Sequence, residues 1–176
     1  MGAWMEYPGA LSANKTRIRR VIGVADMAVS DSTEDFLITY SLGSCIAVVI
    51  YDPVASVGGM LHYMLPESNL DPEKARKNPC MFADTGITHL FKSSYKMGAK
   101  KENIVVKTVG GAQTLDPNGV FNIGKRNYLA MRKIFWKNNV AVSAEHIGGE
   151  VNRTVRLLMD TGKVLMKVGR EAEIEI

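Results

Sequence analysis

Two apolar runs separated by a short polar turn constrain the fold of this chain more than any other feature. Residues 46–51 form a continuous apolar run. Residues 57–65 form a second, largely apolar run, which Gly58-Gly59 weaken at its start and Pro66 ends. A short apolar run bounded by turn residues is typical of a buried strand. Since Asp52-Pro53 fits a turn, the two runs are consistent with a β-hairpin whose turn spans Asp52 to Ser56.

Further strand patterns lie on both sides of this pair, with helical patterns between them. We expect strands over residues 21–29, 36–40, 104–109, 140–146, 151–159 and 163–168, and an edge segment over 171–176. One helix is expected from Asp84, as the N-cap, to Gly98, and a second over residues 124–138. Surface loops are expected at residues 67–80 and at Asp116-Pro117-Asn118-Gly119. The pattern therefore predicts an α+β fold, a layered sandwich of mostly antiparallel strands with two main helices.

Length and composition indicate one globular domain. The chain has 176 residues, of which 46% are hydrophobic and 23% charged. We expect a poorly structured N-terminal segment over residues 1–18 and a single domain over 19–176. No apolar run reaches the roughly 18 residues that span a bilayer, and no apolar signal region opens the chain. With two cysteines too few for a disulfide framework, we expect a cytoplasmic protein without membrane insertion.

Charge and motif spacing exclude several functional classes. The net charge is +4, and much of the excess lies in residues 15–20. That segment fits a solvated basic arm better than a nucleic-acid site, because no aromatic residues or recognition motif accompany it. Gly110-Gly111 lacks the Lys-Ser/Thr of a phosphate-binding loop. The cysteines and histidines show no zinc-like spacing, so we expect no metal, no cofactor and no nucleic-acid partner.

One cysteine stands where a nucleophile would be expected. Cys45 follows Gly43-Ser44 and precedes the first apolar run, His62 lies in the second run, and Thr39 lies upstream. A thiol, a base that titrates near neutral pH and a group that orients the base are sufficient for nucleophilic catalysis. An adjacent charged His62 would lower the thiol pKa. Backbone N–H groups at Gly43 and Ser44 could support an oxyanion. Each residue also has a structural explanation, as a buried cysteine, a core histidine and a strand threonine.

The ordered motifs resemble those of the CheD family of chemoreceptor glutamine deamidases, over roughly residues 20–169. The matching segments are Leu42-Gly43-Ser44-Cys45, Asp52-Pro53, residues 59–66, Ala83-Asp84-Thr85, Gly110-Gly111-Ala112, residues 122–127, Gly148-Gly149 and Thr161-Gly162-Lys163. The sequence departs from the family at His146, where an acidic residue is usual, and fits it loosely at residues 150–153.

The resemblance implies hydrolysis of glutamine side-chain amides to glutamates on the cytoplasmic helices of methyl-accepting chemotaxis receptors. It implies Cys45 as nucleophile, His62 as general base and acid, and Thr39 as the residue that orients His62. It also implies a CheC-type phosphatase as partner. The alternatives are a non-catalytic regulator that binds such a phosphatase, a transglutaminase-like or papain-like thiol enzyme, and a structural domain with an inert thiol.

Overall fold

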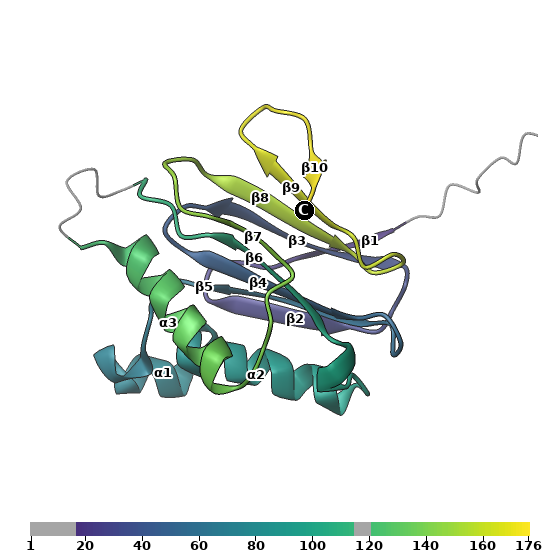
Figure 1. Ribbon diagram of the computed structural model, residues 1–176, viewed down its shortest axis with the longest axis horizontal. Coiled ribbons are helices and arrows are strands. Elements are labelled where there is room, and N and C mark those ends of the chain that lie inside the picture. Colours follow the sequence, from purple (N-terminus) through teal and green to yellow (C-terminus); the bar gives the residue numbers. More distant parts are fainter. Residues whose placement is uncertain (1–16, 115–120) are drawn as a thin grey trace, which may run out of the picture.

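The computed structural model describes residues 17–114 and 121–176, which form two stacked sheets with helices against one of them (Figure 1). Sheet A has the order β1-β3-β8-β9-β10 and sheet B the order β2-β5-β4-β6-β7. Sheet A comprises β1 (Ile18–Val21), β3 (Asp35–Leu42), β8 (Arg153–Leu158), β9 (Val164–Val168) and β10 (Ile174–Glu175). Sheet B comprises β2 (Asp26–Ser30), β4 (Ile46–Asp52), β5 (Val57–Tyr63), β6 (Val105–Gly110) and β7 (Ala144–Ile147). Strands β1 and β3, and strands β6 and β7, pair in parallel, whereas the other neighbours are antiparallel.

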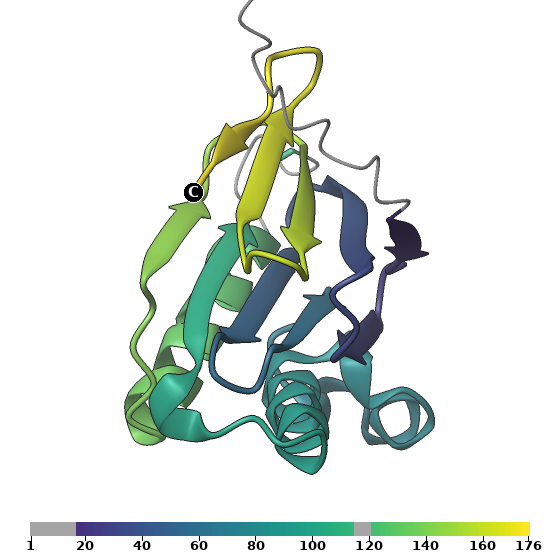
Figure 2. The ribbon, with the colours of Figure 1, turned by 90° about the vertical axis from the view of Figure 1, so that its right-hand side faces the viewer.

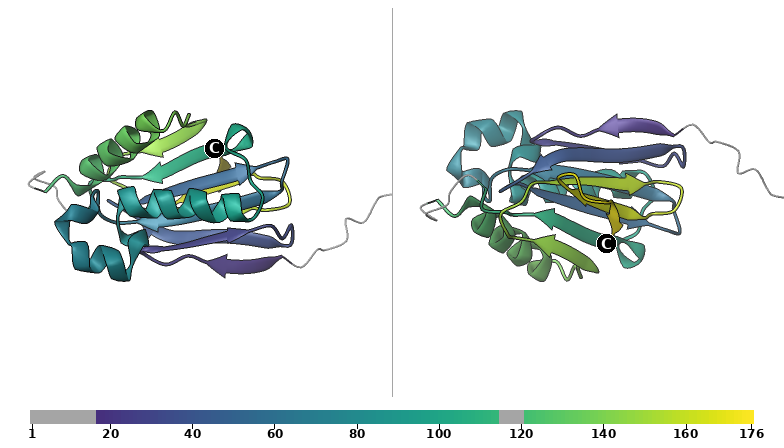
Figure 3. Two further views of the ribbon diagram at one scale, coloured as in Figure 1. Left: turned by 90° about the horizontal axis from the view of Figure 1, so that it is seen from below. Right: turned by 90° about the horizontal axis from the view of Figure 1, so that it is seen from above.

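The helices all lie on the outer side of sheet B (Figures 2 and 3). They are α1 (Pro72–Lys77), α2 (Ala83–Lys96) and α3 (Ile123–Lys137), and short 3₁₀ turns span Ser68–Leu70, Pro79–Met81 and Lys101–Asn103. The described part of the chain therefore has three layers, namely sheet A, sheet B and the helices. This arrangement confirms the predicted α+β sandwich of mostly antiparallel strands with two main helices.

The central strands of sheet B are buried on both faces, which explains their continuous apolar sequence. Ile46, Val48 and Ile50 of β4 belong to the core under the helices. Ala47 and Val49 belong to the core between the sheets. Because successive side chains of a strand point to opposite faces, a strand between two apolar layers needs an apolar residue at nearly every position. The β4–β5 pairing confirms the predicted hairpin.

The strand predicted over residues 21–29 is wrong, because this segment contains the end of one strand and most of another. Val21 ends β1 in sheet A, and Asp26 begins β2 in sheet B. Between them Ile22 donates its N–H to Ile38 O, and Ala25 donates its N–H to His62 O. Ala25 has a φ of 58°, a left-handed conformation that interrupts a strand. The chain crosses from one sheet to the other at this point.

Two predictions for the segment before α2 are also wrong. The loop predicted over residues 67–80 contains α1, which Asp71 caps by accepting a hydrogen bond from Lys74 N and which Pro72 begins. Asp84 is not the N-cap of α2, because Phe82 holds that position. The Asp84 carboxylate instead accepts hydrogen bonds from Ser68 N and Oγ. A tertiary contact therefore uses the carboxylate that was expected to cap the helix.

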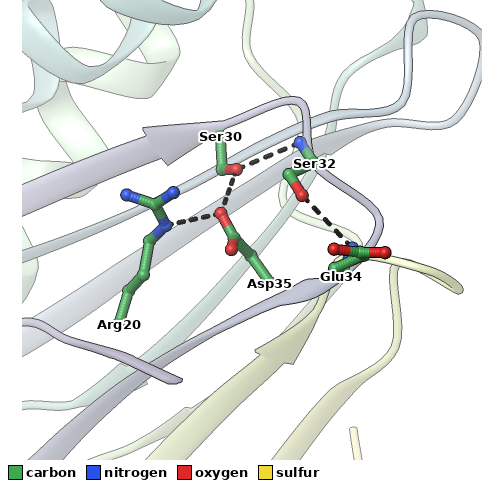
Figure 4. Close-up of polar contacts among 5 residues, drawn as sticks. All are labelled: Arg20, Ser30, Ser32, Glu34 and Asp35. Carbon is green, nitrogen blue, oxygen red and sulfur yellow. Dashed lines mark hydrogen bonds and ion pairs between the residues drawn. The ribbon is translucent and has the colours of Figure 1, made fainter. Parts of the chain in front are cut away.

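A buried carboxylate joins the edges of the two sheets (Figure 4). Asp35, at the start of β3, is fully buried and accepts hydrogen bonds from Arg20 Nε and Ser30 Oγ, both at 2.5 Å. Arg20 lies in β1 of sheet A and Ser30 ends β2 of sheet B. Because a buried charge needs partners, this cluster holds the first strands of both sheets in a fixed relation.

Some predictions concern residues outside the described part of the chain. The loop at Asp116-Pro117-Asn118-Gly119 lies there, as do residues 1–16 of the predicted N-terminal segment. Ile18 is the first residue of β1, so regular structure begins within the range predicted to lack it. Within residues 17–114 and 121–176, no helix has the length and apolar character needed to cross a membrane.

Candidate active site

The β4–β5 hairpin brings Cys45 and His62 to the same face of sheet B. Ala47 pairs directly with His62, and directly opposed residues of antiparallel strands project to the same face. Cys45 lies two residues before Ala47, packs against the core between the sheets, and is half-buried. The thiol and the imidazole are thus diagonal neighbours at the end of the strand pair. Diagonal neighbours lie about 7–8 Å apart, with their Cβ atoms somewhat closer than that.

Thr39 contacts His62 across the space between the sheets. Its Oγ1 lies 2.7 Å from His62 Nδ1, and it donates a hydrogen bond of 2.8 Å to Ile22 O. A threonine hydroxyl has one hydrogen, and a carbonyl oxygen only accepts, so this hydrogen goes to Ile22. Thr39 must therefore accept from an Nδ1–H of His62. This bond fixes the neutral tautomer in which Nε2 carries the lone pair that a general base needs.

Burial keeps His62 neutral near pH 7. The side chain is 1% exposed, and burial lowers its pKa from 6.5 to about 4. Its Nε2 atom has no hydrogen-bond partner among the described protein groups, so the Cys45 thiol does not contact it in this conformation. The structure positions Nε2 as an unprotonated acceptor beside the thiol, without the contact that proton transfer requires.

The Cys45 thiol is also uncharged in this conformation. Burial raises the pKa of Cys45 above its usual value, and the residue's own backbone N–H lowers it by less. The sequence suggested that a charged His62 would depress the thiol pKa, but the low pKa of His62 argues against that charge. Both groups lie in an apolar layer that disfavours ions. The resting pair is therefore a neutral thiol and a neutral imidazole.

Three hydrogen bonds fix the backbone of the Gly43–Cys45 turn. Its successive carbonyl oxygens accept from Ala112 N at 2.8 Å, Asn127 Nδ2 at 3.0 Å and Gly111 N at 2.8 Å. The donors belong to the loop after β6 and to α3. Two motifs that are distant in sequence from Cys45 thus converge on it. Because each carbonyl is held, the orientation of each peptide plane in the turn is also held.

Two glycines permit this close approach of backbone segments. A Cβ on Gly110 would lie 2.2 Å from Cys45 O, and a Cβ on Gly124 would lie 2.4 Å from Gly111 O. Both distances are far inside van der Waals contact, and Gly110 also has a φ of +126°. A side chain at either position would push apart the segments that support the turn.

Polar side chains surround Gly43 at the start of this turn. A Cβ on Gly43 would lie 2.6 Å from Thr114 Oγ1 and 2.9 Å from Asn152 Oδ1. Just upstream, Ser41 has a φ of 56° where the β3–β8 register shifts. Such bulges often redirect a strand beside a functional site. The turn is therefore crowded by polar groups that the sequence did not associate with it.

A buried arginine supports the loop on the other side of the turn. Arg153 is 3% exposed and donates from Nε to His146 Nδ1 at 2.8 Å and from Nη2 to Gly148 O at 2.6 Å. His146 is the position where the resemblance led us to expect an acidic residue. Its Nδ1 accepts from a guanidinium N–H and therefore carries no hydrogen itself.

The other candidate residues lie elsewhere. Cys80 is 8% exposed in the core under the helices, and His89 is exposed on α2. Neither is a neighbour of Cys45 in the sheet. In the described ranges, no group of three or more His, Cys, Asp or Glu side chains is arranged to hold a metal ion.

Asn127 is the site residue that the sequence analysis did not identify. It is fully buried, and its Nδ2 reaches both Ser44 O and Met64 O. The available signals were its place at the end of the family-like segment 122–127 and its position on α3, four residues before the buried Met131. An asparagine in the apolar stripe of a helix requires internal hydrogen bonds, although its partners cannot be predicted from helical spacing.

The fold and this arrangement define an α+β sandwich with a cysteine and an oriented histidine at one end of the central strand pair. The family model described as "CheD chemotactic sensory transduction" matches residues 64–168. A relative from Syntrophus aciditrophicus (strain SB), named "Probable chemoreceptor glutamine deamidase CheD 1", is 54% identical over 84% of this chain and 92% of its own length. A relative from Solibacter usitatus with a similar name is 49% identical over 88% of the chain and 92% of its own length. The "Chemoreceptor glutamine deamidase CheD" of Thermotoga maritima is 39% identical over 90% of the chain and 98% of its own length.

The chain belongs to the CheD family, and the resemblance inferred from the ordered motifs is thereby confirmed.

Replacing Gly110 with alanine should destabilise the protein more than the same change at Gly98. Both glycines have a positive φ, of +126° and +99°, but a Cβ on Gly98 would meet nothing within 4 Å. Gly98→Ala therefore reports backbone strain alone, at about 1 kcal/mol. Gly110→Ala adds the collision with Cys45 O and should cost at least about 2 kcal/mol more. Urea denaturation measures both, and equal losses would contradict the steric role of Gly110.

Lowering the pH should reduce the free energy of unfolding, because the buried His62 becomes protonated more readily in the unfolded chain. Because its folded pKa, about 4, lies below the unfolded value of 6.5, the unfolded chain binds the proton first as the pH falls. The stabilisation is complete above pH 6.5 and is lost progressively towards pH 4, by about 3 kcal/mol in total. Urea denaturation of the wild type and of His62→Gln at several pH values should show a shallower dependence in the variant. His89→Gln, at an exposed histidine, is the control and should follow the wild type; identical slopes for all three proteins would contradict the prediction.

Proposed function

We propose that this protein hydrolyses glutamine side-chain amides to glutamates on chemoreceptors, with Cys45 as nucleophile. The observation that carries the proposal is the 2.7 Å contact between Thr39 Oγ1 and His62 Nδ1, which aligns the base on the face of sheet B that also holds Cys45. Membership of the CheD family and the names of its relatives support the reaction and the substrate class. The enzyme is a cysteine-dependent protein-glutamine amidohydrolase.

In the first half of the reaction, His62 removes the thiol proton as the sulfur attacks. The proton moves from Cys45 Sγ to His62 Nε2, a bond forms between Sγ and the amide carbon, and the amide oxygen becomes an oxyanion. Backbone N–H groups at the Gly43–Cys45 turn, those of Ser44 or Cys45 in particular, are the proposed donors to that oxygen. Thr39 accepts from Nδ1–H throughout and stabilises the imidazolium that forms.

In the second half, the same proton leaves with the product. His62 transfers it to the amide nitrogen, the carbon–nitrogen bond breaks, and ammonia departs from a thioester. A water molecule then gives a proton to His62 and its oxygen to the thioester carbon. The carbon–sulfur bond breaks, the thiol regains its proton, and a glutamate side chain is released. No group beyond water and the substrate is consumed, and we propose no metal or organic cofactor.

The neutral resting pair suits this mechanism. A histidine with a pKa of about 4 is unprotonated at neutral pH and can accept a proton. Because burial raises the thiol pKa, the free thiolate is scarce until a substrate occupies the site. The thiol must also move within hydrogen-bond reach of Nε2, a tightening common when a substrate binds. Cys45 would then attack as a thiol that loses its proton to His62 during the attack, and not as a thiolate formed beforehand.

We further propose that the substrate segments are cytoplasmic helices of chemotaxis receptors, that the protein acts in the cytoplasm, and that a CheC-type phosphatase is a partner. These proposals rest on the family resemblance. A non-catalytic regulator of such a phosphatase is the main rival. If Cys45→Ala stimulated the phosphatase normally while the wild type deamidated no receptor, the regulator would be the better description. Incorporation of amines into glutamine would instead indicate a transglutaminase.

Cys45→Ala should abolish deamidation because it removes the nucleophile. Purified receptor incubated with wild-type protein should gain about one mass unit for each glutamine converted to glutamate. Mass spectrometry of receptor peptides should show no gain with Cys45→Ala and a normal gain with Cys80→Ala, since Cys80 lies in the core under the helices. An undiminished gain with Cys45→Ala, or none with the wild type, would refute the proposal.

Thr39→Val should lower kcat, whereas Thr39→Ser should retain most of it. Valine has nearly the shape of threonine but cannot accept from His62 Nδ1–H, so the tautomer with a free Nε2 loses its support. We expect a fall in kcat of about 10²-fold, within the range of general-base catalysis. Steady-state kinetics measures the fall, and nitrogen NMR of the imidazole reports the tautomer. Equal kcat values for the two variants would show that the hydroxyl does not orient His62.

A further inference from the structure

The amide of Asn127 joins the two chain segments that carry Cys45 and His62. Its Nδ2 donates one hydrogen bond to Ser44 O and one to Met64 O, each 3.0 Å long. Ser44 directly precedes Cys45, and Met64 is two residues after His62. A carboxamide nitrogen has two hydrogens, so both are committed and the position of the amide is determined by both segments. This side chain thus adds a link between the segments just beyond the end of the β4–β5 ladder.

The bond to Ser44 O also sets the direction of the next N–H. The structure has no cis peptide bond, and in a planar trans peptide the C=O and the following N–H point in opposite directions. Because Asn127 holds Ser44 O on the α3 side, the Cys45 N–H points away from α3. This N–H lies near the residue's own sulfur, where it lowers the thiol pKa against the larger effect of burial. It is therefore directed to the side where an attacked carbonyl would sit.

Packing alone does not explain an asparagine at this position. Asn127 is fully buried on the face of α3 that carries Met131 and Phe135. Its Oδ1 has no hydrogen-bond partner among the described protein groups. A buried unpaired polar atom costs about 1–3 kcal/mol, so a leucine of similar volume would suit the core better. The carbonyls of Gly43 and Cys45 already accept from backbone N–H groups, whereas that of Ser44 depends on this side chain.

We propose that Asn127 is a positioning residue that orients the Cys45 N–H as the main oxyanion donor. The inference rests on the deamidase function proposed above and deepens it. Asn127 touches neither the substrate nor the reacting atoms. It acts through the Ser44–Cys45 peptide, because a donor to the carbonyl fixes the plane and also polarises the N–H of the same peptide unit. The peptide that contains the Ser44 N–H is held separately, by the bond from Ala112 N to Gly43 O, so Asn127 acts on the Cys45 N–H alone.

Asn127→Leu tests the proposal, with Tyr63→Phe as the matched control. Leucine keeps the volume and removes the donor to Ser44 O. Tyr63 Oη donates to the backbone oxygen of Asn127 at 2.9 Å, so Tyr63→Phe removes a buried hydrogen bond at the same place but leaves both amide bonds intact. We expect Asn127→Leu to lower kcat by between about tenfold and 10²-fold, below the full loss of an oxyanion donor. KM should stay within about twofold, and Tyr63→Phe should retain kcat.

A second measurement does not depend on deamidation. In a Cys80→Ala background, the rate of alkylation by iodoacetamide against pH gives the pKa of Cys45. Asn127→Leu should raise the pKa of Cys45, because the Cys45 N–H is then no longer held towards the Cys45 sulfur. Tyr63→Phe should leave that pKa unchanged. If Asn127→Leu fails to fold by circular dichroism, Asn127→Ala takes its place with the same readouts.

The outcomes separate the two proposals. An unchanged kcat and an unchanged thiol pKa in folded Asn127→Leu, with only a loss of stability, would overturn the positioning role. A loss confined to KM would overturn it as well. If the wild type deamidates no receptor glutamine, the proposed function fails, and the thiol titration still decides whether Asn127 orients the Cys45 N–H.

Discussion

The hydrogen bond between Thr39 and His62 crosses an apolar layer, and the chemistry of the candidate site depends on it. Thr39 belongs to sheet A and His62 to sheet B, and both are almost completely buried. A polar pair in such a layer is stabilised only when its hydrogen bonds are made internally. The carbonyl of Ile22 takes the hydroxyl hydrogen and thereby obliges the imidazole to donate. One backbone oxygen thus decides which nitrogen of His62 can act as a base.

Fixed backbone groups also determine the position of Cys45, the proposed nucleophile. The turn before Cys45 is held by three carbonyl hydrogen bonds from two separate segments. These segments approach closely because Gly110 and Gly124 have no side chain. A cysteine on an unsupported turn would sample many positions, and a catalytic group displaced by about 1 Å can lose much of its rate. The rigid sandwich therefore provides the precision that a half-buried thiol and a neutral histidine require.

The sequence predicted the strands β4 and β5 because strands buried on both faces must be apolar throughout, and the short turn between them was consistent with the hairpin that they form. It also predicted the helices α2 and α3 and the strands β8 and β9, whose periodicities are strong. It failed at residues 21–29, where the chain changes sheet without a change in apolar pattern, and at Asp84, whose carboxylate makes a tertiary contact. It missed Asn127, because the carbonyls that this residue serves lie far away in sequence.

The sequence by itself determined the residue types of the candidate site, the two apolar runs that pair, and the family. Local periodicity and ordered motifs carry that information, because each depends on neighbours along the chain. Only the tertiary structure decided that Thr39 accepts from His62, that burial keeps both Cys45 and His62 uncharged, and that Asn127 holds the peptide before the nucleophile. Hydrogen-bond direction and desolvation depend on groups from different strands and helices, and folding alone brings these groups together.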